Sequence, residues 1–308
     1  MSNRFRPAWL LVLAALSTSA LAKAPETVNI GYQKANIFAL LKYRGTLDES
    51  LKKQGIAVRW VEFPAGPQML EGLNVGSIDL AATGDAPPAF AQAAQADLVY
   101  LAHSPANPKT EAIVVPEQSA IHSVADLKGK RVGLNKGSDV NYLLVAALEK
   151  AGLSYKDITP VYLPPADARG AIDAWVIWDP FLAEVENNAK ARQIRNAEGL
   201  VPHYTFYLAS RKFADTYPET AKQVVDELGK LSAWANSHQD EAAGLLSTST
   251  GLDKAIWLKT LARLPYGAER MTPAVYNEQQ ALADTFTRIG LLPVKVDVRS
   301  ATWSLDKP

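Results

Sequence analysis

The sequence contains no cysteine and only three methionines among its 308 residues. The absence of cysteine excludes disulfides, thiolate metal sites and cysteine nucleophiles. It also excludes the anchor of a bacterial lipoprotein, because that lipid is attached to a cysteine. Neither sign of charge is in excess, since 32 basic residues balance 32 acidic ones. We therefore expect no nucleic-acid surface and no polybasic membrane patch.

Signatures of catalysis and of metal binding are also lacking. No G-x-S-x-G elbow and no phosphate-binding P-loop occurs in the chain. The histidines lie far apart, without the spacing of metal ligands, and we expect each of them at the surface or in a loop: His103, His122, His203 and His238. The sequence thus predicts no catalytic residue, no metal ligand and no cofactor.

The N-terminus has the order of features found in a secretory signal. Arg4 and Arg6 precede an apolar run over 8–16, and Ala20-Leu21-Ala22 forms a cleavage box. The run is shorter than the ~20 residues that cross a bilayer. A cleavable signal peptide over 1–22 and a periplasmic location are predicted, the alternative being a frayed N-terminal helix. No later stretch resembles a membrane span, so a soluble mature chain is expected. Without Arg4 and Arg6, 30 basic residues face 32 acidic ones, a net charge of about −2.

Strand patterns alternate with helical ones from residue 27 to residue 210, which predicts an α/β fold. The expected strands are 27–32, 58–63, 78–82, 98–102, 111–115, 131–134, 159–163, 174–177 and 206–210. The expected helices between them are 38–53, 67–75, 87–94, 124–127, 140–151 and 181–189. From Arg211 onward the pattern is almost wholly helical, with helices over 213–237, 241–248, 254–264 and 273–289.

Two α/β units followed by a helical tail indicate two lobes with a ligand cleft between them. We expect residues 23–112 and 211–308 to form lobe 1 and residues 113–210 to form lobe 2. The strands over 111–115 and 206–210 would cross between the lobes as the hinge. A weak internal similarity supports two units, because the strand pattern at Ile78-Asp79-Leu80 is echoed at Ile172-Asp173-Ala174. Chance similarity between α/β units is the alternative.

Ligands of open α/β sheets bind beyond the carboxyl ends of the strands. Three such ends are Gly31-Tyr32-Gln33, Ala82-Thr83-Gly84-Asp85 and Asn135-Lys136-Gly137-Ser138. The last two are glycine-containing loops that open a helix, so their backbone N–H groups and the helix dipole can form an anion site. The hydroxyls of Thr83 and Ser138 would add neutral donors. Ordinary strand-to-helix turns are the alternative for either loop alone.

A sulfonate suits such a site, because it is always ionised, offers three acceptor oxygens and has no proton to donate. A carboxylate facing it would repel it, so Asp85 and Asp139 are interpreted as helix caps turned to backbone N–H groups. The Trp178 indole, just before Asp179-Pro180, would wall an apolar pocket for an alkyl tail. Trp175 and Trp178 as plain core residues are the alternative.

Several segments resemble the periplasmic aliphatic sulfonate-binding proteins. They are Gly31-Tyr32-Gln33-Lys34, the run from Trp60 to Glu71, the run from Asn74 to Asp79, Thr83-Gly84-Asp85-Ala86-Pro87-Pro88, the run from Ala125 to Gly129, Lys136-Gly137-Ser138 and Trp178-Asp179-Pro180. The resemblance runs through essentially the whole mature chain. It implies a two-lobed type II periplasmic binding protein fold and delivery of alkanesulfonates to an ABC permease in the inner membrane.

Carried over residue by residue, the resemblance implies a pocket that includes Gln33, Thr83, Gly84, Gly137, Ser138 and Trp178. Asp85, Asp139 and Asp179 belong to the same motifs. A monomer that acts without a cofactor is expected. The chain departs from these relatives at Arg169-Gly170-Ala171, where they carry several more residues. We expect this shortened segment either to form a tight turn with a vestigial helix or to shift locally and displace Trp178, and to leave apolar surface of the second lobe exposed.

The sequence leaves two alternatives: another ligand bound by the same fold, and another class of protein. Binding proteins of the same fold for taurine, nitrate, bicarbonate or a thiamine precursor would share these motifs. An enzyme on the same scaffold, such as a sulfinate desulfinase or a pyrimidine-forming enzyme, is the alternative from another class. A desulfinase of this kind works through a cysteine nucleophile, which the chain lacks. We therefore expect a binding protein and not an enzyme.

Overall fold

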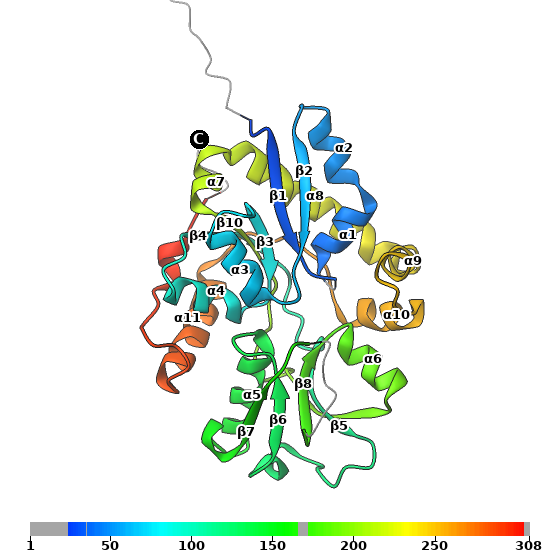
Figure 1. Cartoon of the computed structure of the whole chain (residues 1–308), viewed down its shortest axis with the longest axis vertical. Coiled ribbons are helices and arrows are strands. Elements are labelled where there is room, and N and C mark those ends of the chain that lie inside the picture. Colours follow the sequence, from blue (N-terminus) through cyan, green and yellow to red (C-terminus); the bar gives the residue numbers. More distant parts are fainter. Residues whose placement is uncertain (1–23, 35, 166–171, 305–308) are drawn as a thin grey trace, which may run out of the picture.

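The computed structural model describes residues 24–34, 36–165 and 172–304. The predicted signal peptide over 1–22 lies outside these residues. Two five-stranded sheets, each with helices packed on it, form two lobes that lie one above the other (Figure 1). The expected two-lobed α/β architecture is confirmed. Within the described ranges, no helix is long and apolar enough to cross a membrane.

The first sheet has the strand order β2-β1-β3-β10-β4. Its strands are β1 (Thr27–Tyr32), β2 (Ala57–Glu62), β3 (Leu80–Thr83), β4 (Leu98–His103) and β10 (Phe206–Ser210). β1 is parallel to β2 and β3, whereas β10 is antiparallel to β3 and β4. The helices of this lobe are α1 (Ile37–Arg44), α2 (Thr46–Lys52), α3 (Gly66–Asn74), α4 (Ala86–Ala93), α7 (Arg211–Thr216), α8 (Pro218–Ser237), α9 (Gln239–Thr250), α10 (Lys254–Arg263) and α11 (Pro273–Arg288).

The second sheet has the order β7-β6-β8-β5-β9. Its strands are β5 (Glu111–Pro116), β6 (Arg131–Leu134), β7 (Thr159–Tyr162), β8 (Ala174–Trp178) and β9 (Ala191–Asn196). The helices of this lobe are α5 (Asp139–Lys150) and α6 (Phe181–Asn188), and short 3-10 turns cover Val124–Leu127, Tyr155–Asp157 and Val298–Ala301 in the two lobes. The sequence pattern missed β9, a charged edge strand whose half-buried residues show no alternation of apolar and polar side chains.

The expected lobe boundaries and hinge need correction. β10 pairs with β3 and β4, so Phe206–Ser210 belongs to the first sheet and not to the second lobe. β5 pairs along its length with β8 and β9, so Glu111 already lies in the second sheet. The chain therefore crosses between the lobes over 104–110 and 197–205. These crossovers run side by side, because Asn107 N–H donates to the His203 carbonyl at 2.9 Å and Ser104 N–H donates to the Thr205 carbonyl at 2.8 Å.

The internal similarity seen in the sequence has a counterpart in the topology. β3 and β8 each occupy the third place in their sheets, and each ends at the same inter-lobe cavity. One expected helix, 38–53, is broken into α1 and α2. Gly45 ends α1 in the left-handed conformation, with φ of 72°, which a residue with a Cβ adopts only with strain.

The shortened segment that departs from the relatives falls on residues 166–171, which lie outside the described residues. The neighbouring strand is nevertheless covered, since Trp175 is 8% exposed and Val114 3% exposed. A hollow of about 640 Å³ lies beside them, lined also by Ile172 and Val185. The expected exposure of apolar surface is therefore not seen at these residues.

Candidate functional site

A cavity lies between the two lobes, at the carboxyl ends of strands from both sheets. Its empty space, including the part open to solvent, is about 730 Å³. The wall combines hydroxyl and amide groups with aromatic and aliphatic side chains: Gln33, Asn36, Ile37, Gly66, Ala82, Thr83, Gly84, Ser104, Asn107, Thr110, Ser138, Asp139, Trp178, Asp179, His203, Thr205, Tyr207, Leu264 and Tyr266. Residues of both lobes and of both crossovers thus meet in one site.

Five of the described helices, α1, α3, α4, α5 and α6, begin at this cavity, and they differ in how their first turns are capped. α3 follows Ala65, whose side chain cannot cap it. Asn36 caps α1 by accepting the N–H groups of Phe38 and Ala39, and Asp179 accepts the N–H of Ala183 in α6. α4 and α5, in contrast, receive no side-chain cap hydrogen bond from Asp85 and Ser138, the described residues at their N-caps. A helix N-terminus without a cap leaves backbone donors and a positive dipole end for an anion.

The predicted hydroxyl donors are already engaged within the protein. Ser138 donates its hydroxyl to the carbonyl of Asn135 at 2.8 Å, and Thr83 donates to the carbonyl of Gly84 at 3.0 Å. A hydroxyl has one proton to give. At these two loops the donors left for an anion are therefore backbone N–H groups at the starts of α4 and α5.

Seven of the nine predicted site residues line the cavity: Gln33, Thr83, Gly84, Ser138, Asp139, Trp178 and Asp179. Gly137 does not, because it faces the Phe90 ring in a separate hollow and donates its N–H to Asn141. Asp85 lies behind the wall and is 3% exposed. Trp178, whose displacement was one expected effect of the shortened segment, lies in the cavity wall.

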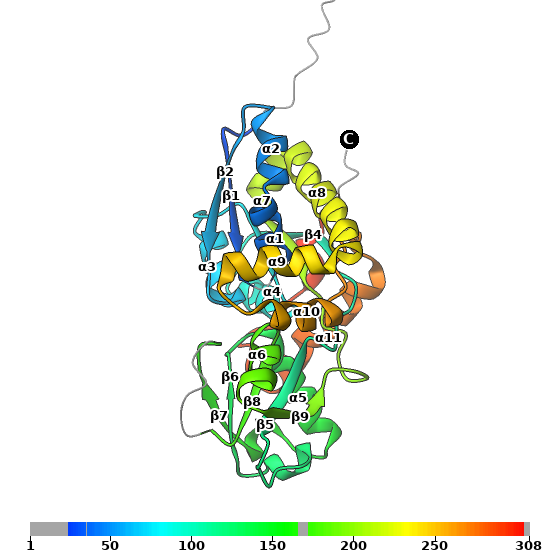
Figure 2. The ribbon, with the colours of Figure 1, turned by 90° about the vertical axis from the view of Figure 1, so that its right-hand side faces the viewer.

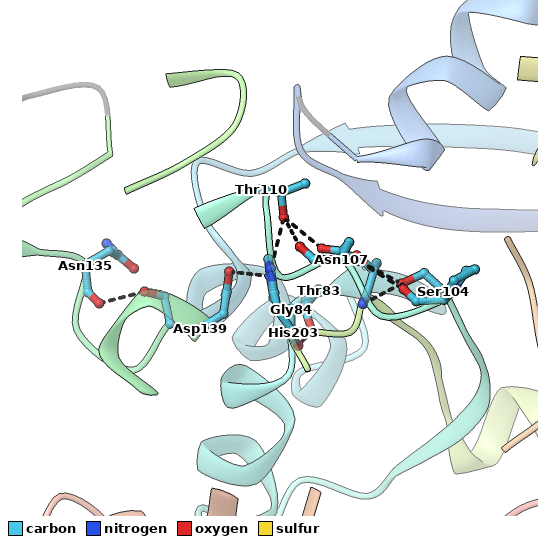
Figure 3. Close-up of polar contacts among 11 residues, drawn as sticks. Thr83, Gly84, Ser104, Asn107, Thr110, Asn135, Asp139 and His203 are labelled. Carbon is cyan, nitrogen blue, oxygen red and sulfur yellow. Dashed lines mark hydrogen bonds and ion pairs between the residues drawn. The ribbon is translucent and has the colours of Figure 1, made fainter. Parts of the chain in front are cut away.

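The interpretation of Asp85 and Asp139 as helix caps was wrong. Asp85 makes no cap bond, and its Oδ1 is buried without a partner among the described residues. Asp139 is instead 3.1 Å from His203, measured from its Oδ2 to Nε2 (Figure 3). Burial raises the pKa of the Asp85 carboxyl to about 7, against the opposing charge of His203.

His203 was expected at the surface or in a loop without a role, and the structure places it inside. It is 6% exposed, and its φ of 52° is left-handed. Its Nδ1 lies 3.0 Å from the Thr110 hydroxyl, which lies 2.8 Å from both the carbonyl and the side-chain oxygen of Asn107 (Figure 3). Burial by itself lowers the pKa of His203, but the carboxylates of Glu111 and Asp139 outweigh it and raise that pKa. His103 is buried as well.

Contacts between the lobes surround the cavity. A Cβ added to Gly84 would lie 2.3 Å from Oδ1 of Asp139, so the first-lobe loop fits against α5 only as glycine. Figure 2 shows α10 of the first lobe above α6 of the second. There Arg263 pairs with Glu186 and, at 3.4 Å, with Asp179. The structure therefore has its lobes in contact across the site.

Tyr266 is a wall residue that sequence reasoning missed. It follows α10, its side chain is 5% exposed, and its hydroxyl is buried without a partner among the described residues. Asn236 holds its backbone, accepting its N–H and donating to its carbonyl. No local pattern could have identified it, because it follows a helix of the C-terminal tail and most of the cavity wall comes from segments far away in the chain.

Two α/β lobes joined by paired crossovers around an anion-accepting cavity define a two-lobed solute-binding protein. Comparison with known sequences identifies the family: the model described as "NMT1/THI5 like" matches residues 51–242, and the chain belongs to this family. It is 42% identical to a putative aliphatic sulfonates-binding protein of Escherichia coli (strain K12), with 94% of this chain and 93% of the relative covered.

Two solved structures extend this likeness. The alkanesulfonate-binding protein SsuA from Xanthomonas axonopodis pv. citri, bound to MOPS, is 43% identical, with a TM-score of 0.87 and coverage of 92% of this chain and 99% of that one. The periplasmic aliphatic sulphonate binding protein SsuA from Escherichia coli is 42% identical, with a TM-score of 0.84 and coverage of 91% and 93%. The resemblance predicted from the sequence motifs is thereby confirmed, together with the periplasmic binding protein fold.

Proposed function

We propose that this protein captures aliphatic sulfonates in the periplasm and delivers them to an ABC permease. The observation that carries the proposal is the pair of uncapped helices, α4 from one lobe and α5 from the other, that begin at one inter-lobe cavity. The backbone N–H groups at their N-termini offer donors and positive potential, which fits the sulfonate head group. Relatives at more than 40% identity carry sulfonate-binding names.

The apolar part of the wall accounts for an organic anion in preference to an inorganic one. Trp178, Ile37 and Leu264 line the same cavity as the helix N-termini. An alkyl tail buried against such side chains contributes about 0.8 kcal/mol for each CH₂ removed from water. Sulfate and phosphate have no tail, so they gain nothing from this wall.

The proposal also includes export of the chain to the periplasm and delivery of its ligand to the permease. The charged and apolar segments before the cleavage box at Ala20-Leu21-Ala22 are typical of a signal peptide and would bring the chain to the periplasm. The protein would act as a monomer that closes on its ligand and presents it to the permease. Its close relatives are binding proteins, and no catalysis is proposed for this one.

A thermal-shift and calorimetric panel tests the assignment. The mature chain is titrated with C2 to C8 alkanesulfonates, taurine, nitrate, sulfate and phosphate. A ligand at 100 times its Kd should add about 2.7 kcal/mol of stability. We expect alkanesulfonates to protect the protein most, with affinity rising as the tail grows. Equal or stronger protection by an inorganic anion would refute the sulfonate assignment.

A further inference from the structure

Three side chains with metal-ligand chemistry meet at the inter-lobe cavity, and two of them belong to its wall. Glu111 lies at the start of β5, Asp139 in the first turn of α5, and His203 in the second crossover. One carboxylate oxygen or ring nitrogen from each lies within 4.8 Å of those of the other two. Their exposed fractions are 0%, 9% and 6% respectively, so all three are buried.

The imidazole of His203 is oriented as metal-binding histidines usually are. Its Nδ1 faces the Thr110 hydroxyl at 3.0 Å, and that hydroxyl can donate its only proton to Asn107. Nδ1 then carries the ring proton, and Nε2 is directed at Asp139 (Figure 3). A hydrogen-bond partner of this kind fixes the tautomer and direction of a ligating imidazole.

Hydrogen bonding within the protein does not explain the buried carboxyl group of Glu111. Both oxygens of its carboxyl group are buried, and neither has a partner among the described residues. A proton shared between His203 and Asp139 would account for that pair. Protonating Glu111 would remove its charge but leave two polar atoms without partners, which is costly in a buried site. A cation would pair with both oxygens and remove the charge at once.

The charges around the cavity also favour a bound cation. Asp139 lines the cavity, and Asp85 and Glu111 are buried and interact electrostatically with it and with His203. Asp139 and His203 thus line the space that the proposed function fills with an anion, and the carboxyl groups of Asp85 and Glu111 are buried near them. Carboxylates repel an anion, and the repulsion is strongest where water is excluded. A divalent cation among them would offset two of these negative charges and so weaken the repulsion of an anion.

We propose that Glu111, Asp139 and His203 bind a divalent cation, which completes the anion site; its role in anion binding rests on the proposed function. One imidazole nitrogen and two carboxylate oxygens suit Zn²⁺ or Mn²⁺. Zn²⁺ holds such donors at about 2.0–2.2 Å from itself, and hence at about 3.5 Å from one another. Small side-chain rotations from the present separations would reach that arrangement.

The test begins with metal binding to the mature full-length chain after dialysis against a chelator. Calorimetry with ZnCl₂ and MnCl₂ should show one high-affinity ion per chain. Glu111→Gln and His203→Asn should each lower that affinity roughly tenfold or more, as loss of a metal-site residue does. Asparagine is chosen at 203 because it tolerates a left-handed backbone. His122→Asn, at an exposed histidine, is the matched control and should bind the ion like the wild type.

The second arm measures affinity for hexanesulfonate in the chelated and in the metal-loaded protein. Tighter binding by the metal-loaded form supports the proposal. Absence of stoichiometric metal binding, or binding that survives both variants when circular dichroism shows them folded, overturns it. Equal sulfonate affinity in both forms overturns the role in anion binding, and proton uptake measured in several buffers would then identify protonation as the neutralising event. Metal binding without any sulfonate binding would instead refute the proposed function.

Discussion

Replacement of Tyr266 by phenylalanine should separate ligand affinity from stability. The Tyr266 hydroxyl lines the inter-lobe cavity region, is buried, and has no partner among the described residues. Burial raises the pKa of this hydroxyl above its already high value, so it stays protonated and able to donate at physiological pH. We expect it to donate to an oxygen of the bound sulfonate.

Tyr266→Phe is expected to lower the affinity for the sulfonate but not the stability of the unliganded protein. A hydrogen bond to a charged group contributes about 1.5–3 kcal/mol, so Tyr266→Phe should weaken sulfonate binding by roughly ten- to 150-fold. A buried hydroxyl without a partner costs free energy in the folded protein, so its removal should leave the unliganded protein equally stable or more stable by about 1 kcal/mol. Few substitutions of a wall residue are expected to lower affinity without lowering stability.

Calorimetry with hexanesulfonate and urea unfolding of the unliganded protein measure the two effects. Tyr276→Phe is the matched control, because the Tyr276 hydroxyl is also buried but Tyr276 is not part of the cavity wall. The control should keep wild-type affinity. Unchanged affinity in Tyr266→Phe, or a loss of stability of more than about 1 kcal/mol, would refute this account of the hydroxyl.

Three further predictions concern closure, pH and the α5 cap. Gly84→Ala should lower sulfonate affinity at least tenfold in calorimetry, because its Cβ would meet Asp139 at 2.3 Å when the lobes close; Gly229→Ala, with open space in α8, should leave affinity unchanged. Burial raises the pKa of Asp179 to about 6 against the charge of Arg263. The folded state therefore binds this proton more tightly than the unfolded state, and stability from urea unfolding should fall by about 2 kcal/mol as pH rises from 4 to 6, a slope that Asp179→Asn should lack. Ser138→Ala should cost about 1 kcal/mol of stability, from the lost bond to Asn135, and change affinity less than Tyr266→Phe does; the reverse order would restore Ser138 as the direct donor.

Local pattern predicted most of the fold. Strands such as Arg131–Leu134 and helices such as Ala86–Ala93 are marked by runs of apolar residues and by glycine or proline near their ends, signals that lie within a few residues of one another. β9 was missed because a charged edge strand carries no such signal. The assignment of β10 to the wrong lobe has a similar cause, since a strand's sequence does not say which sheet it joins.

The residues of the site also include some that local sequence could predict and some that it could not. Loops after strands, such as Thr83-Gly84 before α4, could be identified from sequence because the strand, the turn and the helix are adjacent in the chain, and most of them do line the cavity. The residues that meet those loops in the folded protein could not be identified from sequence. Asp139 and His203 are 64 residues apart and meet only because the crossover over 197–205 passes α5. Tyr266 reaches the cavity from beyond α10, and Glu111 is fully buried at the start of β5. Sequence alone determined most of the elements and the family, and it predicts the signal peptide. Tertiary structure decided which polar groups are already bonded to one another and which remain for a ligand, because that depends on contacts between segments distant in the chain.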